Sequence, residues 1–109
     1  MAQKPGYLNG KHYSSYVMEI EQLTRENKLA EAEILLYQCV SATEAESKAE
    51  GLGVAPYYYD KLALIYRKQK DLLKEFSILE RYSKQKHAPG VKPPKLLERF
   101  EKVKTLLTK

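Results

Sequence analysis

The chain has 109 residues, one cysteine and a formal net charge of +5, and its length suits a single domain with its own core. One cysteine excludes an internal disulfide, and no apolar run approaches the roughly 18 residues that a membrane-spanning helix needs. The first residues lack the apolar segment of a secretory signal. We therefore expect a cytoplasmic protein that does not contact a membrane.

The charge is distributed unevenly along the chain. Residues 1–55 carry 5 Lys and Arg against 8 Asp and Glu, a balance of −3, whereas residues 56–109 carry 14 against 6, a balance of +8. A basic half of this kind predicts an anionic partner. It equally fits attraction between the two halves, within one chain or between two copies.

Residues 1–12 predict a flexible lead-in, because they combine Pro5, Gly6, Asn9 and Gly10 without an apolar period. From residue 13 on, apolar side chains recur every three or four residues, which predicts a first helix. Its apolar stripe consists of Tyr13, Tyr16, Val17, Ile20 and Leu23. A turn is expected at residues 27–28.

A second helix is predicted from Leu29 to residue 50, with an apolar stripe that consists of Leu29, Ala32, Leu36, Cys39 and Val40. Its later turns are rich in helix formers but contain few large apolar side chains, so we expect them to be solvated. Gly51 and Gly53 end the helix.

Two further helices follow in the basic half. Pro56 suits the first turn of a third helix, which extends to residue 69. After a turn at residues 70–71, a fourth helix has an apolar stripe that consists of Leu72, Leu73, Phe76, Leu79 and Tyr82.

Prolines and a glycine in residues 87–94 break the helical pattern. A fifth helix then carries Leu96, Phe100, Val103 and Leu107 on one face. Because the fourth helix would otherwise leave apolar surface open to water, we expect the fifth helix to dock on it. No segment alternates with period two over enough residues to predict a strand, so the predicted fold is all-α.

The third helix contains Tyr59, Leu62, Ala63 and Tyr66, a large-x-x-large-small-x-x-aromatic pattern, and a shift of 43 residues aligns the first helix with it. Over residues 13–86 the chain resembles the tetratricopeptide repeat (TPR) family, whose helix–turn–helix units stack on copies of themselves. In the second unit, Glu75 stands at a position where the family has a small residue. This difference puts a tight contact between the third and fourth helices in question.

The resemblance implies a five-helix TPR-like antiparallel helix-hairpin stack. It consists of two helix–turn–helix units, residues 13–50 with an extension near 44–55 and residues 56–86, and of a C-terminal capping helix at residues 93–108. All of them belong to one domain, residues 13–109.

The resemblance also implies a non-enzymatic module that binds another protein, as an adaptor or as a small regulator. In the family, the first helix of each unit lines the concave binding surface. By position this surface includes Val17, Glu21, Thr24 and Arg25 in the first unit and Tyr57, Asp60, Leu64, Arg67 and Lys68 in the second. We expect no clamp for a terminal carboxylate, because a third unit and the required Asn residues are missing.

Three consecutive tyrosines, Tyr57 to Tyr59, stand at the start of the third helix. Successive helical positions are rotated by about 100°, so the three side chains cannot all be buried. Tyr59 belongs to the core pattern, and Tyr57 or Tyr58 is expected to project. The projecting ring either forms part of a binding surface or is covered by a neighbouring segment.

No residue pattern predicts catalysis, a metal or a cofactor. His12 and His87 lie in segments without a helical period, and one cysteine cannot build a zinc site. Cys39 lies on an apolar stripe, where a buried thiol is the ordinary role. Glu44, Glu46 and Glu50 are interpreted as a solvated acidic face rather than as an acid–base pair or a cation site.

Nucleic acid is the alternative partner. The basic residues Arg67, Lys68, Lys70, Lys74, Arg81, Lys84, Lys86, Lys92 and Lys95 are interleaved with tyrosines that can stack on bases. The segment from Gly53 to Tyr82 is also similar to helical tails of bacterial DNA-processing nucleases. We rank this accessory role second, because Lys and Arg populate the polar faces of most short helices. A homodimer is a further expectation for so short a stack.

Overall fold

The computed structural model describes residues 4–90 and 92–108. Its elements are β1 (Tyr7–Leu8), β2 (Lys11–His12), the 3-10 helix η1 (Tyr13–Tyr16), α1 (Val17–Arg25), α2 (Leu29–Glu50), α3 (Pro56–Lys68), α4 (Leu72–Ser83) and α5 (Lys92–Leu107). The prediction of five helices is confirmed. In the ranges that the structure describes, no helix has the length and apolar character needed to cross a membrane.

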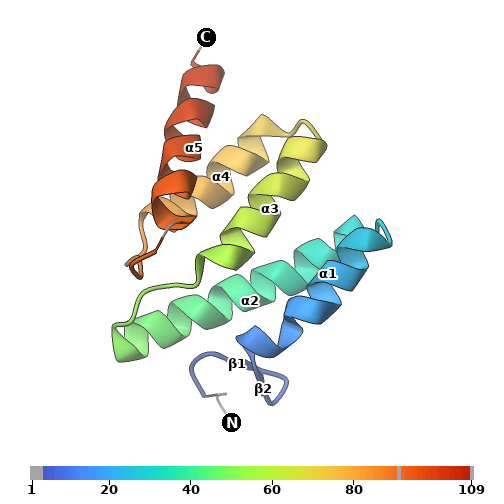
Figure 1. The fold of residues 1–109 in the computed structure, drawn as a ribbon, viewed down its shortest axis with the longest axis vertical. Coiled ribbons are helices and arrows are strands. Elements are labelled where there is room, and N and C mark those ends of the chain that lie inside the picture. Colours follow the sequence, from blue (N-terminus) through green and yellow to red (C-terminus); the bar gives the residue numbers. More distant parts are fainter. Residues whose placement is uncertain (1–3, 91, 109) are drawn as a thin grey trace.

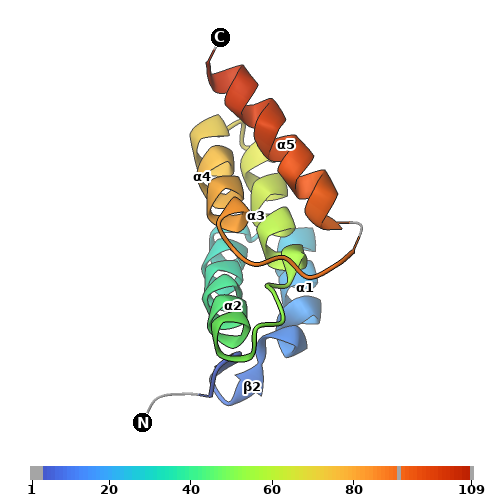
Figure 2. The same cartoon turned by 90° about the vertical axis from the view of Figure 1, so that its left-hand side faces the viewer.

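Each helix packs against the next one in the chain, from α1 to α5, and α3 also contacts α5 (Figure 1). The molecule measures 47 × 33 × 25 Å. In Figure 2, α2 and α4 lie on one side, and α1, α3 and α5 lie on the other. The helices therefore form two layers.

The two turns between paired helices lie where they are predicted. Asn27 and Lys70 have positive φ angles of 59° and 57°, a conformation that ends helices. The Asp71 carboxylate then accepts the Lys74 N–H at 3.1 Å and caps α4, as expected for Asp at this position.

The loop after α2 packs against the segment that follows α4. Val54 pairs with His87 as an isolated bridge. Gly53 has φ +93°, and a Cβ atom there would lie 2.5 Å from the backbone nitrogen of Ala88. This close approach requires glycine.

The prediction that no strand forms is wrong at the N-terminus. β1 and β2 form an antiparallel hairpin, and Leu8 is buried in the core. Asn9 and Gly10, which connect the strands, have φ angles of 51° and 81°. An Asn-Gly pair in this conformation favours a tight hairpin turn. Each strand has only two residues, too few for an alternating pattern. Residues 1–3 of the predicted lead-in lie outside the described residues.

The later turns of α2 are less solvated than predicted, since Ala42, Thr43 and Ser47 are buried. The Thr43 hydroxyl accepts the Ala55 N–H at 2.9 Å, and the Ser47 hydroxyl accepts the Gly53 N–H at 3.1 Å. The loop before α3 therefore covers this part of α2.

The predicted docking of the fifth helix on the fourth is confirmed. Leu96, Phe100 and Val103 of α5 are buried, and the Phe100 ring lies 5.5 Å from the ring of Phe76 in α4. Residue 109, at the end of the predicted domain, lies outside the described residues.

Candidate binding site

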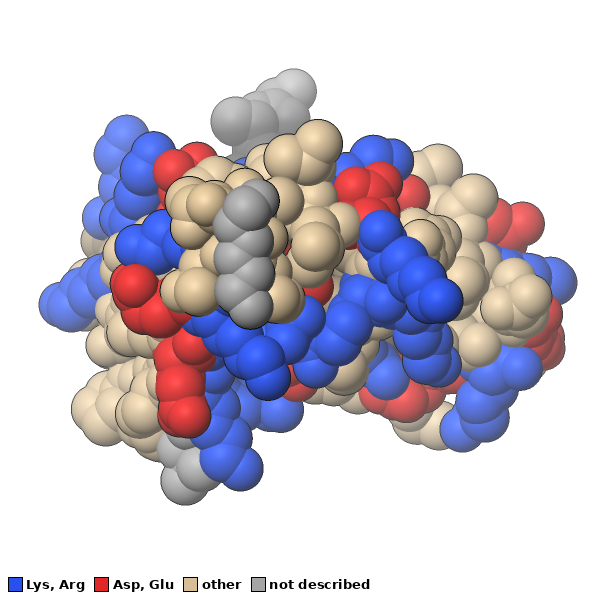
Figure 3. Space-filling view, turned by 90° about the horizontal axis from the view of Figure 1, so that it is seen from above, with Lys and Arg blue, Asp and Glu red and all other residues tan. Residues whose placement is uncertain are grey.

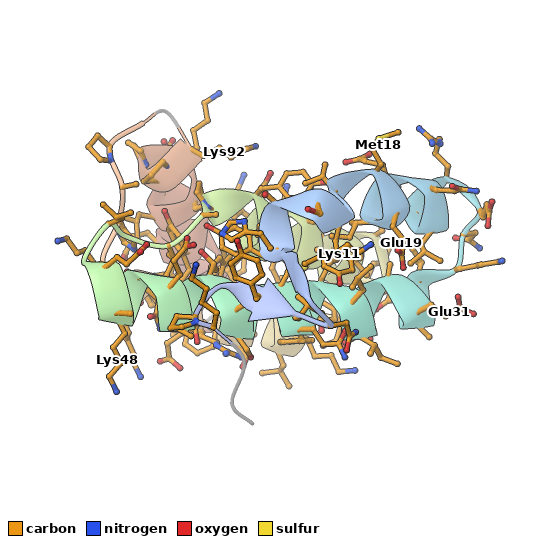
Figure 4. All side chains as sticks on the ribbon, turned by 90° about the horizontal axis from the view of Figure 1, so that it is seen from below. Lys11, Met18, Glu19, Glu31, Lys48 and Lys92 are labelled. Carbon is orange, nitrogen blue, oxygen red and sulfur yellow. The ribbon has the colours of Figure 1, made fainter. Side chains whose placement is uncertain are left out.

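The site lies on one side of the molecule. Met18 of α1 and Lys92 at the start of α5 project from this side, whereas Lys48 of α2 projects from the opposite side (Figure 4). We use the term α1/α3/α5 face for the surface formed by the outward side chains of these three helices. Met18 is 83% exposed, and the sequence analysis did not single it out.

One edge of α3 is joined to α1. The Tyr57 hydroxyl of α3 donates to the Glu21 carboxylate of α1, and Lys61 Nζ lies 3.2 Å from Glu21 Oε1. The hydrogen bond from Tyr57 is the main reason why the pKa of Glu21 is lowered. Two of the predicted surface residues, Tyr57 and Glu21, therefore bind each other.

The other edge of α3 faces α5. Asp60 accepts a hydrogen bond from Lys92 Nζ at 3.0 Å, and Arg67 of α3 also faces α5. Leu64 lies between the two edges on the same helical stripe and is 37% exposed. Lys68 is exposed at the end of α3.

The predicted residues of α1 contribute less to the face. Arg25 is exposed in the last turn, and Val17 is half-buried. The Thr24 hydroxyl donates to the Ile20 carbonyl of its own helix at 2.8 Å.

A buried carboxylate joins three helices beneath this face. Glu75 of α4 has no exposed surface. It accepts Arg67 Nε of α3 at 3.1 Å, and it accepts Arg99 of α5 through Nε at 2.7 Å and Nη2 at 3.0 Å. These hydrogen bonds to Glu75 raise the pKa of Arg99. A carboxylate in the interior is stable only with such partners, and α3 and α4 remain in close contact around Glu75.

A pocket of about 220 Å³ lies between α3 and α5, beside the two arginines that bind Glu75. It is lined by Asp60, Arg67, Lys92, Lys95, Leu96 and Arg99. The structure thus brings two predicted residues, Asp60 and Arg67, together with three basic residues of α5. Arg99 was missed, although positions 92, 95 and 99 share one face of a helix by their spacing.

The pocket is cationic. Four of its lining residues are Lys or Arg, and only Asp60 and the underlying Glu75 are acidic, which leaves a net charge of +2. In the view from above, Lys and Arg side chains extend across much of the visible surface, with acidic groups between them (Figure 3).

The structure distinguishes the three tyrosines. Tyr58 and Tyr59 are buried, and their hydroxyls donate to the Tyr13 carbonyl at 3.0 Å and to Glu44 Oε2 at 2.7 Å. Tyr57 is half-buried and is the one that projects. Its burial, and then its contact with Glu21, raise its pKa.

The interpretation of residues 44, 46 and 50 as a solvated acidic face is wrong for the first two. Glu44 accepts Nε and Nη2 of Arg81, each at 2.8 Å. Glu46 accepts from His12 Nε2 at 2.6 Å and from the Tyr13 hydroxyl at 2.9 Å. The cause is that the hairpin packs against α2 and that the Arg81 side chain of α4 reaches Glu44. Glu50 is exposed.

His12 lies between a serine and a carboxylate, an arrangement that the sequence did not reveal. Its Nδ1 is 2.8 Å from Ser14 Oγ, and its Nε2 binds Glu46. A serine–histidine–acid line can activate a nucleophile. Here, however, Nδ1 also accepts the Ser14 backbone N–H at 3.3 Å and caps η1. We therefore assign these residues to the attachment of the hairpin to α2.

Cys39 and His87 serve packing. Cys39 is fully buried, as predicted, and desolvation raises the pKa of its thiol to about 12. The His87 ring stacks on Tyr82 at 4.3 Å. Within residues 4–90 and 92–108, no group of three His, Cys, Asp or Glu side chains is arranged to hold a metal ion.

No protein-family model matches the sequence, and no curated protein or solved structure is significantly similar to it. The function must therefore be argued from the residues and their arrangement.

Proposed function

We propose that this chain is a non-enzymatic protein–protein interaction module, a TPR-like adaptor or small regulator that binds another protein along the α1/α3/α5 face. The observation that carries the proposal is the exposed stripe of α3. This stripe lies between the edge of α3 that binds α1 and the edge that faces α5. Leu64 offers apolar area there, Tyr57 lies at one end, and the cationic pocket lies beside it.

The arrangement of the helices supports this proposal. Two antiparallel pairs, α1 with α2 and α3 with α4, are followed by α5, and alternate helices share a layer (Figure 2). A TPR-like stack has this order, and its first-helix layer is the side that binds partners. Ion pairs also join α3 to Glu21 of α1 and to Lys92 of α5, so all three helices of this layer contribute to one surface.

The proposal is tested by changing exposed apolar residues on opposite sides. Leu64→Glu should reduce capture of partner proteins from source-cell lysate at least tenfold, because it places a charge at the centre of the interface. Leu73→Glu is the matched control, since Leu73 is 71% exposed on α4. Equal recovery of the same proteins with both variants would contradict the proposed surface.

Arg67 is unsuitable for such a test. Arg67→Glu would place a second carboxylate beside the buried Glu75, so a loss of binding would reflect a damaged fold. Lys68→Glu is the better charge variant, because Lys68 is exposed next to Leu64 on the same stripe.

A nucleic-acid-associated accessory module is the second candidate, favoured by the excess of +8 in residues 56–109. Binding to short single- and double-stranded DNA and RNA should then fall steeply with salt, as counterion release requires. Absence of binding at 50 mM salt would exclude this function.

A further inference from the structure

The charge of the pocket between α3 and α5 points to a specific class of ligand. We propose that this pocket binds the phosphate monoester of a phosphorylated side chain on the partner protein. The inference rests on the proposed function, because Asp60 and Arg67 of the α1/α3/α5 face line this pocket.

The pocket has a surplus of two positive charges. Lys92 is neutralised by Asp60, whereas Arg67 and Arg99 share the single carboxylate of Glu75. Lys95 is exposed at the rim. A phosphate monoester carries about −1.5 to −2 at neutral pH, which matches this surplus. A carboxylate or a phosphodiester carries only −1 and would leave the pocket positively charged.

The two guanidinium groups are already oriented. Glu75 accepts Nε of both arginines and Nη2 of Arg99, and it lies behind them with no exposed surface. Arg67 Nη2 also lies 3.1 Å from Glu75 Oε2, which leaves the Nη1 groups of both arginines to donate to a ligand, and arginine donors fit phosphate oxygens in pairs. Because Glu75 fixes the side chains before the ligand arrives, binding loses little conformational entropy.

The size of the pocket is compatible with this ligand. At about 30 Å³ for each water molecule, a volume of about 220 Å³ holds about seven waters. A phosphoryl group and the side-chain atom that carries it can replace several of them while the rest bridge to Lys92 and Lys95. The apolar Leu96 side chain lines the same pocket and can contact the carbon atoms of the phosphorylated residue.

The test is a titration of the labelled protein with N-acetyl-phosphoserine amide, followed by NMR of the arginine Nε–H groups. The chain has four arginines. We expect the Nε–H signals of Arg67 and Arg99 to shift while those of Arg25 and Arg81 do not. Dimethyl phosphate and acetate, each with one negative charge, should bind at least fivefold more weakly.

Two exposed lysines of α5 provide the matched variants. Lys95→Ala should weaken the binding of N-acetyl-phosphoserine amide about threefold to fivefold, the effect of one exposed charge. Lys102→Ala should leave the affinity unchanged, because Lys102 is exposed on the same helix but does not line this pocket.

Several results would overturn the proposal. They are equal affinity for dimethyl phosphate, shifts that do not centre on Arg67 and Arg99, and binding of inorganic phosphate without binding of N-acetyl-phosphoserine amide. The last result would mean that the pocket takes a free anion. The proposed function is tested separately, since Leu64 lies outside the pocket, and a negative titration leaves the Leu64→Glu result valid.

Discussion

Glu75 determines how three helices meet. Its carboxylate in α4 is fully buried and binds Arg67 of α3 and Arg99 of α5. Removing a charge from water is costly, and here two charge-assisted pairs offset that cost. The same residue positions both arginines of the candidate pocket.

Replacing this carboxylate should destabilise the fold. We expect Glu75→Gln to lower the free energy of unfolding by about 3 kcal/mol, the lower end of the range for breaking a buried ion pair. The lower end applies because both arginines keep some contact with water. Urea unfolding measures the change. Glu98→Gln on the exposed side of α5 should stay within about 0.5 kcal/mol of the parent, and an equal loss in both variants would contradict the role of Glu75.

Buried thiol and phenol groups make the fold sensitive to alkali, and Cys39 and Tyr82 are two of them. Burial raises the pKa of the Cys39 thiol from 9.0 to about 12 and that of the Tyr82 hydroxyl from 10.0 to about 12. As pH rises, the unfolded chain therefore loses these protons before the folded chain does. Stability should be unaffected by these groups below about pH 9 and should fall between pH 9 and 12.

The urea midpoint, measured from pH 7 to pH 11, checks this expectation. Cys39→Ala removes one of these groups, so the stability of the variant should decline less steeply above pH 9 than that of the parent. Parallel pH profiles for the two proteins would show that Cys39 does not contribute.

At the level of the elements, α5 completes the core. Its Leu96, Phe100 and Val103 side chains are buried, and Phe100 packs against Phe76 of α4. Because α3 also contacts α5, the helix covers both members of the second pair.

Truncating the central side chain of α5 should therefore destabilise the whole domain. We expect Phe100→Ala to lower the free energy of unfolding by about 3–5 kcal/mol, the usual range for a buried Phe, as measured by chemical unfolding. Leu106→Ala is the control on the same helix, since Leu106 is 38% exposed. If Phe100→Ala melts like the parent but loses a binding partner, α5 is a ligand for that partner and not a cap.

The helices could be predicted because each has an apolar stripe with helical period, and because turns with Asn27 or Lys70 separate them. The hairpin could not be predicted from an alternation of apolar and polar residues, since strands of two residues are too short to show one. Its signal is the Asn9–Gly10 pair, which also fits the flexible lead-in that was predicted for residues 1–12. The buried end of α2 was missed because Thr43 and Ser47 are polar and become buried only when the loop before α3 folds over them.

The candidate site was predictable only in part. Asp60 and Arg67 follow from their position on the third helix. The role of Arg99 depends on which helix packs beside α3 and on the burial of Glu75, and neither is readable from spacing. The hydrogen bond between His12 and Glu46 likewise joins residues 34 positions apart.

For the molecule as a whole, the charge asymmetry is partly neutralised within one chain. Glu21 pairs with Lys61 and Glu44 pairs with Arg81, so the acidic first half and the basic second half attract each other across α1, α2, α3 and α4. Attraction between the two halves within one chain, one of the alternatives that the charge distribution left open, is therefore present. Attraction between two copies stays a prediction.

The fold combines a linear order of helices with one continuous core. A stack in which each unit contacts only its neighbours can lose its ends before its centre. Here a single cluster of buried side chains extends from Leu8 to Val103, and small single domains usually unfold in one step.

We therefore expect one cooperative transition, with a calorimetric enthalpy equal to the van't Hoff enthalpy. Ile20→Val in α1 and Val103→Ala in α5, at opposite ends of the core, should each lower the melting temperature, by about 4–8 °C for each kcal/mol lost. In both variants, far-ultraviolet circular dichroism and tyrosine fluorescence should report the same midpoint. Separate melting of α5 in Val103→Ala, seen as early loss of amide protection in residues 96–107 alone, would mean that α5 unfolds independently of the other helices.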